Sequence, residues 1–187
     1  MAGWAQPLVL ASTSPQRRAI LAALGVAFTV VAPAYEEHDA PGVDAAELAL
    51  RHARGKAASA QGGIVLGVDT VVTIDGGVLG KPADRDEARR SIETLAGRDH
   101  HVHSALAVRC DGVEVCRSVV TRVRFRPLSG AEVERYVDTG EWNGRAGGYA
   151  VQGAGAGLVE TIEGDHSNVV GLPVAALVDA LGELAGC

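Results

Sequence analysis

The chain has 187 residues, of which 47% are hydrophobic and 21% are charged, and its net charge is −6. This length suits one domain, or one domain in two lobes, with a sizeable core. The negative charge argues against broad binding to nucleic acid or to an anionic membrane, since both partners need a basic surface. No apolar run reaches the length of a membrane span, and residues 1–6 lack the features of a signal peptide. The composition therefore favours a soluble cytosolic protein.

The cysteines point the same way. Cys110, Cys116 and Cys187 are odd in number and lack the spacing of a zinc or redox motif. Such a set suits reduced thiols better than a disulfide framework.

The first predicted elements are a buried strand at 7–11 and a helix at 15–25, joined by a turn rich in hydroxyl groups. Ser14 is placed to cap the helix. The free N–H groups and the dipole at this helix start attract an anion, and Arg17 and Arg18 add positive charge. The alternative is a well-capped helix with two solvated arginines. Because basic residues in the first turn oppose the helix dipole, a bound phosphate would offset them.

A strand at 28–31 leads into an acidic segment that contains Glu36 and Glu37. A solvated acidic loop is the commoner explanation for such a segment, and a set of metal ligands is the alternative. The next helix begins after Asp44, which is placed to cap it. Lys56 lies near the end of that helix and, taken alone, would be a surface lysine.

The segment Leu66–Pro82 predicts two short strands with a tight turn at 75–77. Asp69 interrupts its apolar run, and Lys81 stands between a glycine and a proline. A carboxylate within a buried strand costs several kcal/mol unless it is paired, hydrated or bound to metal. The alternative is that Asp69 marks a turn and Lys81 is solvated.

Further along, the sequence predicts a capped helix after residue 84, a second hairpin turning at 111–112, a helix after 129, a strand at 158–162 and a helix from 173. His101 and His103 share one face of a strand, where solvated residues are expected more than a metal site. The segment 144–157 is dense in glycine. A linker is its simplest explanation, although Tyr149 and Gln152 suit contact with a planar ligand.

Together these motifs resemble the Maf family of nucleoside triphosphate pyrophosphatases over nearly the whole chain. Five separate motifs carry the resemblance, in the family's order: Leu10-Ala11-Ser12-Thr13-Ser14-Pro15-Gln16-Arg17, Glu36-Glu37, Gly67-Val68-Asp69-Thr70 with Gly80-Lys81-Pro82, Tyr149-Ala150-Val151-Gln152-Gly153, and Asn168-Val169-Val170-Gly171-Leu172-Pro173. The resemblance implies one Maf-like domain over 1–187. It also implies an α/β fold with a mixed, twisted sheet in two lobes around a nucleotide-binding cleft.

Family members cut nucleoside triphosphates between the α and β phosphates with a divalent metal, Mg²⁺ or Mn²⁺. They release a monophosphate and pyrophosphate. The resemblance implies substrate binding by Ser12, Ser14, Arg17, Lys56 and Gln152, metal binding by Glu37 and Asp69, and catalysis by Asp69 as the base together with Lys81. Carboxylate oxygens are ligands that such metals accept.

Asp69-Thr70 resembles the family branch that prefers dTTP and UTP, in which the residues at Thr70 and Gln152 help to select the base. Gln16 stands where that branch usually has arginine, at a position linked to specificity. The family also tends to dimerise, which implies a homodimer.

The leading hypothesis is therefore a house-cleaning pyrophosphatase that removes non-preferred or modified pyrimidine nucleotides. A second hypothesis is a nucleotide-binding regulator of division or septum formation with little catalysis. The complete set of acidic and basic residues favours the enzyme, because a binding protein does not need a base. A nucleic-acid binder is disfavoured by the net charge.

Overall fold

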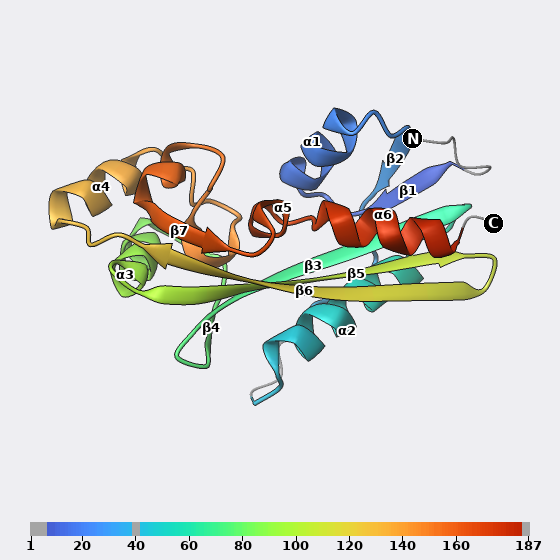
Figure 1. Ribbon diagram of the computed structural model, residues 1–187, viewed down its shortest axis with the longest axis horizontal. Coiled ribbons are helices and arrows are strands. Elements are labelled where there is room, and N and C mark those ends of the chain that lie inside the picture. Colours follow the sequence, from blue (N-terminus) through green and yellow to red (C-terminus); the bar gives the residue numbers. More distant parts are fainter. Residues whose placement is uncertain (1–6, 39–41, 185–187) are drawn as a thin grey trace. The chain divides into compact units, whose positions relative to one another are not determined.

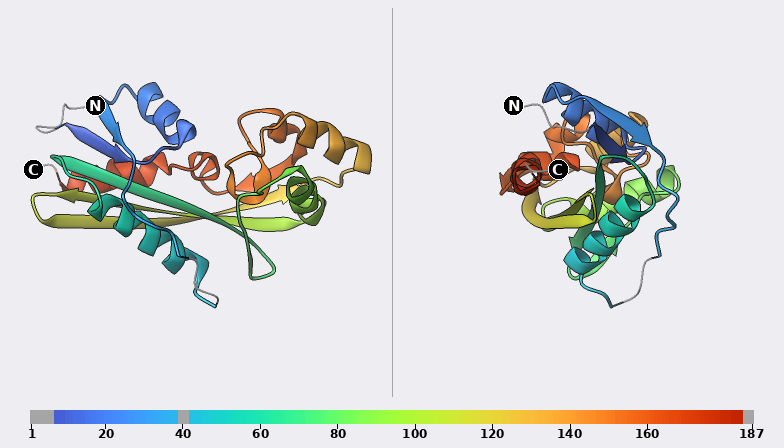
Figure 2. Two further views of the ribbon diagram at one scale, coloured as in Figure 1. Left: turned by 180° about the vertical axis from the view of Figure 1, so that it is seen from behind. Right: turned by 90° about the vertical axis from the view of Figure 1, so that its right-hand side faces the viewer.

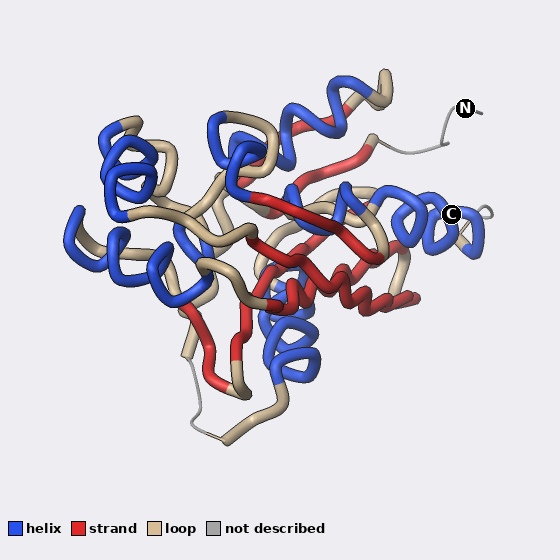
Figure 3. Tube along the Cα trace, turned by 60° about the vertical axis from the view of Figure 1, so that its left-hand side comes forward, coloured by secondary structure: helices blue, strands red, loops and turns tan. Residues whose placement is uncertain are grey.

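The structure is a computed structural model that describes residues 7–38 and 42–184. Residues 1–6, discussed above as a possible signal peptide, and Cys187, one of the three cysteines, lie outside these ranges. Strands and helices follow one another along the chain (Figures 1 and 3). In order they are β1 (Leu8–Ala11), α1 (Pro15–Ala23), β2 (Phe28–Val31), α2 (Ala45–Ala58), β3 (Ile64–Ile74), β4 (Gly77–Leu79), α3 (Arg85–Leu95), β5 (Asp99–Cys110), β6 (Val113–Phe125), α4 (Gly130–Asp138), the 3₁₀ helices η1 (Ala146–Gly148) and η2 (Ala154–Leu158), β7 (Val159–Glu163), α5 (His166–Val170) and α6 (Val174–Glu183).

The seven strands in the described residues form one mixed sheet, with the order β2-β1-β3-β5-β6-β7 and with β4 beside β3. β1 pairs in parallel with both β2 and β3. β4 runs antiparallel to β3, and β7 runs antiparallel to β6. The predicted α/β fold with a mixed sheet is confirmed. Within the described residues, no helix combines the length and the apolar character that crossing a membrane requires.

The chain divides into two compact units. The first unit comprises residues 1–69, 104–119 and 171–187, and the second comprises 70–103 and 120–170. Strands β3, β5 and β6 each contribute residues to both units. The single domain over 1–187 stays a prediction.

The first unit packs helices on both faces of β1 and β3. Leu21 of α1 and Leu177 of α6 join the buried strand residues in one apolar core, so these two helices cover the same face. On the other face α2 approaches closely, because a Cβ on Gly67 of β3 would lie 2.2 Å from the carbonyl oxygen of Ala53. Figure 2 shows α2 on the opposite side of these strands from α1 and α6. Glycine at position 67 permits this approach.

The second unit has its own core, formed by α3, α4 and the neighbouring strands. The ring of His100 packs edge-on against Phe125 and Tyr149, with ring centres 5.1 and 5.4 Å away. A hydrogen bond of 2.8 Å joins His100 Nε2 and the hydroxyl of Tyr149. Burial, and to a lesser degree the positive charge of His101, lowers the pKa of His100 to about 4.

Local signals in the sequence predicted the ends of most elements. The predicted caps Ser14, Asp44, Asp84 and Ser129 all accept backbone hydrogen bonds. The predicted turns at 75–76 and 111–112 have the positive φ angles of tight hairpins, 51° and 77° in the first and 46° and 84° in the second.

The glycine-dense segment 144–157 was harder to predict. It is no linker, since it forms η1 and η2 and buries several of its residues. Helix α5 was not predicted. Cys110 is buried and Cys116 is partly exposed.

The buried His100 makes stability depend on pH. Its folded-state pKa lies below the ordinary 6.5, so the stability it contributes is present above pH 6.5 and is lost as pH falls toward 4. We expect a loss of roughly 3 kcal/mol in unfolding free energy over this range. Urea unfolding at several pH values should show a flatter profile for His100→Gln than for wild type. His166→Gln, at an exposed histidine of the same unit, is the control, and an equally steep profile in His100→Gln would contradict the prediction.

Candidate active site

The strand order of the first unit predicts where a site should lie. β1 lies between β2 and β3, and the helices that follow β1 and β2 lie on opposite faces of the sheet. In α/β sheets, ligands bind in a crevice at the carboxyl ends of two neighbouring strands whose following helices lie on opposite faces of the sheet. Residues 12–17 follow β1, and residues 35–37 follow β2. Asp69 lies two residues past Gly67, which pairs with Ala11 at the end of β1.

Arg17, at the start of α1, is held by residues from the N-terminal and the C-terminal segments of the first unit. Ser14 caps the helix and accepts from the Arg17 N–H. The guanidinium of Arg17 donates to Ser12 Oγ at 3.1 Å and to the carbonyl oxygen of Gly171 at 3.0 Å. Burial lowers the pKa of Arg17, and the charges of Asp69 and Glu37 oppose that shift.

The alternative that both arginines are solvated is therefore wrong for Arg17, which is buried, whereas Arg18 is exposed. The positive charge in the first turn of α1 is offset in this structure by nearby carboxylates.

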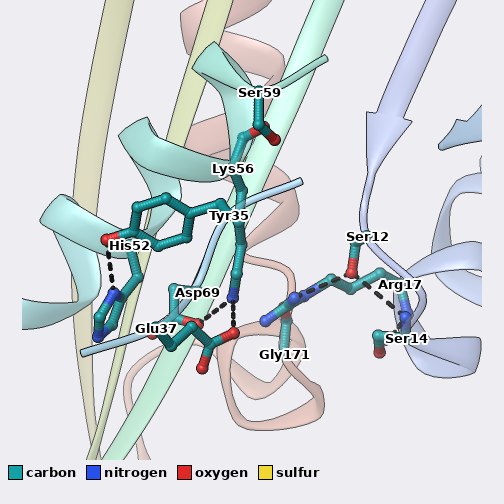
Figure 4. A network of polar contacts seen from close by, with 10 residues as sticks. All are labelled: Ser12, Ser14, Arg17, Tyr35, Glu37, His52, Lys56, Ser59, Asp69 and Gly171. Carbon is teal, nitrogen blue, oxygen red and sulfur yellow. Dashed lines mark hydrogen bonds and ion pairs between the residues drawn. The ribbon is translucent and has the colours of Figure 1, made fainter. Parts of the chain in front are cut away.

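Lys56 of α2 joins the two acidic residues of the predicted site (Figure 4). Its Nζ lies 2.6 Å from Asp69 Oδ1 and 2.7 Å from Glu37 Oε1. The side chains of Lys56 and Asp69 are only 7% and 9% exposed, whereas that of Glu37 is 41% exposed. A buried pair of this kind avoids the cost of an isolated charge. Glu36 instead points into solvent, near His38.

Two sequence-based alternatives are corrected by these contacts. Asp69 does not mark a turn, because β3 is one continuous strand through residues 64–74. Lys56 is not a surface lysine, because the helix face that carries it packs toward β3 and Asp69 pairs with it.

Thr70, Lys81 and Gln152, three of the other predicted site residues, lie in the second unit. Thr70 follows Asp69 on β3, so its side chain points to the opposite face of the sheet. Lys81 is exposed after β4, as the solvated alternative expected, and Gln152 is exposed in the turn before η2. Tyr149 is buried against His100, which argues against direct contact of its ring with a ligand. Gln16 of α1, in the first unit, accepts a hydrogen bond from Ser14 Oγ.

The carboxylates of Glu37 and Asp69 fit a divalent cation chemically. Both reach one nitrogen atom, so their oxygens lie close together, and oxygen ligands suit Mg²⁺ or Mn²⁺. Among residues 7–38 and 42–184 there is no cluster of three or more histidine, cysteine, aspartate or glutamate side chains that could hold a metal. Mg²⁺ commonly takes only one or two carboxylates and completes its shell with water and substrate phosphates. The histidines 101 and 103 form no such cluster either.

The sequence analysis did not identify the roles of four residues that support this site, namely Tyr35, His52, Gly55 and Gly171. Tyr35, two positions before Glu37, bonds to the buried His52 of α2 and lies against Gly55. The only local signal was a glycine inside a predicted helix, which is unfavourable there and so indicates a close approach. The contact of Gly171 with Arg17 could not be predicted, because 154 residues separate the two positions.

The fold and the side chains together define an α/β protein with a polar site near the carboxyl ends of its parallel strands. The site contains both positively and negatively charged side chains. The sequence matches the family model described as Maf-like protein over residues 7–184. The chain belongs to this family.

Curated relatives extend the match over most of their length. A protein of Symbiobacterium thermophilum is 44% identical over 94% of this chain and 93% of its own. One of Thermus thermophilus is 47% identical over 90% of each chain, and one of Anaeromyxobacter dehalogenans is 46% identical over 90% of this chain and 89% of its own. All three are named dTTP/UTP pyrophosphatase.

Removing Lys56 should destabilise the fold through Asp69. In Lys56→Met the buried carboxylate loses its closest counter-ion, and we expect the unfolding free energy to fall by about 3 kcal/mol. The double variant Lys56→Met/Asp69→Asn should recover much of this loss, because no buried charge is left unpaired. Urea unfolding measures both. Equal stability of Lys56→Met and wild type would show that the pair is not buried in solution.

Proposed function

We propose that this protein is a hydrolase that cuts nucleoside triphosphates between the α and β phosphates, with dTTP and UTP as preferred substrates. It releases a nucleoside monophosphate and pyrophosphate. The observation that carries the proposal is the Lys56 ammonium group held between Asp69 and Glu37, beside Arg17. Family membership and the names of the relatives support it.

Cationic groups bind the triphosphate in this proposal. Arg17 and the capped start of α1 offer a guanidinium group and backbone N–H groups, the donors that phosphate oxygens accept. Lys81, which lies in the second unit, stays a predicted catalytic residue. Lys56 carries a second positive charge in the same unit as Arg17. These charges hold the substrate and neutralise the charge that develops as the anhydride bond breaks.

Asp69 is the base. Its carboxylate takes a proton from a water molecule while the water oxygen bonds to a phosphorus atom of the α–β anhydride. The anhydride bond then breaks and pyrophosphate leaves. The pair with Lys56 fixes the orientation of the Asp69 carboxylate before substrate arrives. Glu37 and Asp69 would also hold Mg²⁺ or Mn²⁺, which would supply further charge neutralisation when bound.

Base selection is assigned to Thr70, Gln152 and Gln16. An exposed amide such as that of Gln152 can form paired hydrogen bonds with the edge of a pyrimidine. Gln16 is neutral where the related branch has arginine, so phosphate contacts at this end of α1 depend more heavily on Arg17.

The proposal is tested by pyrophosphate release from a panel of canonical and modified nucleoside triphosphates, with Mg²⁺, with Mn²⁺ and with chelator. We expect release from dTTP and UTP that requires the metal. Release from a purine nucleotide instead would keep the chemistry and replace the substrate. Tight nucleotide binding without any release would overturn the enzyme and favour the regulatory alternative.

Asp69→Asn should lower the turnover number roughly a hundredfold or more, because the amide cannot accept the proton. The fold should survive, since Lys56 keeps its pair with Glu37. Asp75→Asn is the matched control, because Asp75 is an exposed turn residue whose positive φ asparagine also accepts. Near-normal turnover of a folded Asp69→Asn protein would remove Asp69 from the base role.

A further inference from the structure

Glu37 lies on a segment with little regular structure of its own. Residues 32–38 form neither helix nor strand, and the neighbours Glu36 and His38 are exposed. The Glu37 side chain is itself 41% exposed, so its ion pair with Lys56 is partly screened by water. A carboxylate that binds a cation needs a fixed position, and this must come from another contact of the segment.

Tyr35 provides such a contact. Its hydroxyl group and His52 Nδ1 are joined by a hydrogen bond of 3.0 Å, and the two ring centres lie 5.8 Å apart in an edge-on arrangement. His52 is 1% exposed, so this bond ties the segment to a buried group. Figure 4 shows the tyrosine ring lying along α2, between His52 and Lys56.

Gly55 makes this contact possible. A Cβ at position 55 would lie 2.2 Å from Cε2 of the Tyr35 ring, far closer than atoms can approach. Glycine is the least favourable residue after proline inside a helix, and Gly55 lies inside α2 (Ala45–Ala58). The space it leaves is filled by the ring of Tyr35.

The tyrosine and the lysine occupy one face of the same helix. Position 52 is three residues from 55 and four from 56, so it neighbours each of them on the surface of α2. Tyr35 thus binds the helix face that presents Lys56, and Glu37 follows only two residues later. The contacts of Tyr35 with His52 and Gly55 therefore anchor the segment two residues before Glu37.

We propose that Tyr35 is a positioning residue that fixes Glu37 for cation binding by docking its ring in the space left by Gly55 and its hydroxyl group on His52. This inference rests on the assignment of Glu37 as a metal ligand in the proposed function. Tyr35 itself touches neither metal nor substrate in this role.

The test measures Mn²⁺ binding to the substrate-free protein by electron paramagnetic resonance. We expect Tyr35→Phe to weaken Mn²⁺ binding roughly tenfold, as loss of a residue that supports a metal ligand does. Gly55→Ala should weaken it at least as much, because the new methyl group displaces the ring. In hydrolysis assays both variants should need more Mn²⁺ for half-maximal rate, while the turnover number at saturating Mn²⁺ stays near wild type.

Two controls separate positioning from general stability. Tyr136→Phe removes another tyrosine hydroxyl group, which accepts the Ala150 N–H in the second unit, and it should lower thermal stability without changing Mn²⁺ affinity. In a Tyr35→Ala background, Gly55→Ala meets no ring. It should then leave Mn²⁺ affinity unchanged and raise the melting temperature, since alanine is the better helix former.

Glu37→Gln separates the two levels of the proposal. If Glu37→Gln weakens Mn²⁺ binding and Tyr35→Phe and Gly55→Ala do not, the positioning role is overturned while the metal site stands. If Glu37→Gln binds Mn²⁺ as wild type does, or if wild type binds none, the inference falls with the metal assignment. Hydrolysis of the nucleotide panel is judged separately, because it can fail or succeed independently of these affinities.

Discussion

The buried contact between Lys56 and Asp69 is the interaction on which the first unit depends. It places a carboxylate inside a strand that is otherwise apolar, where an isolated charge would be too costly. It also requires α2 to lie close to β3, and Gly67 allows the helix backbone to come within reach. A single pair of charges therefore links the packing of the helix to the chemistry proposed for the strand.

Two further charged residues, Glu37 and Arg17, lie close to the Lys56–Asp69 pair. Glu37 reaches Lys56 from the segment after β2, and Arg17 lies near both carboxylates from the start of α1. Each group offsets the charge of another, so the protein can keep four charged side chains together before any ligand is bound. In the proposed function, a triphosphate with its metal would carry the same mixture of charges and would exchange for these internal partners.

Much of the fold could be predicted from local patterns. The caps at Ser14 and Ser129 and the glycine turns at 75–76 and 111–112 are set by neighbouring residues, so the sequence reveals them directly. The acidic and basic residues of the candidate site were also identified, although their pairing was not. Lys56 looked like a surface residue because its partner Asp69 is 13 positions away on another element. The contacts of Tyr35 with α2 and of Arg17 with Gly171 depend on tertiary packing in the same way, and no local pattern encodes them.

The division of the chain into units has a consequence for synthesis on the ribosome. The second unit is formed by residues 70–103 and 120–170, whereas the core of the first unit joins Leu8 and Leu10 of β1 to Leu177 and Leu181 of α6. Helix α1 can cover part of the apolar face of β1 early, but this core is complete only after α6 has been made. Such long-range closure is slow and leaves hydrophobic surface exposed in the meantime. During translation the second unit can complete its core first, and the first unit, which carries Asp69 and Lys56, is completed afterwards.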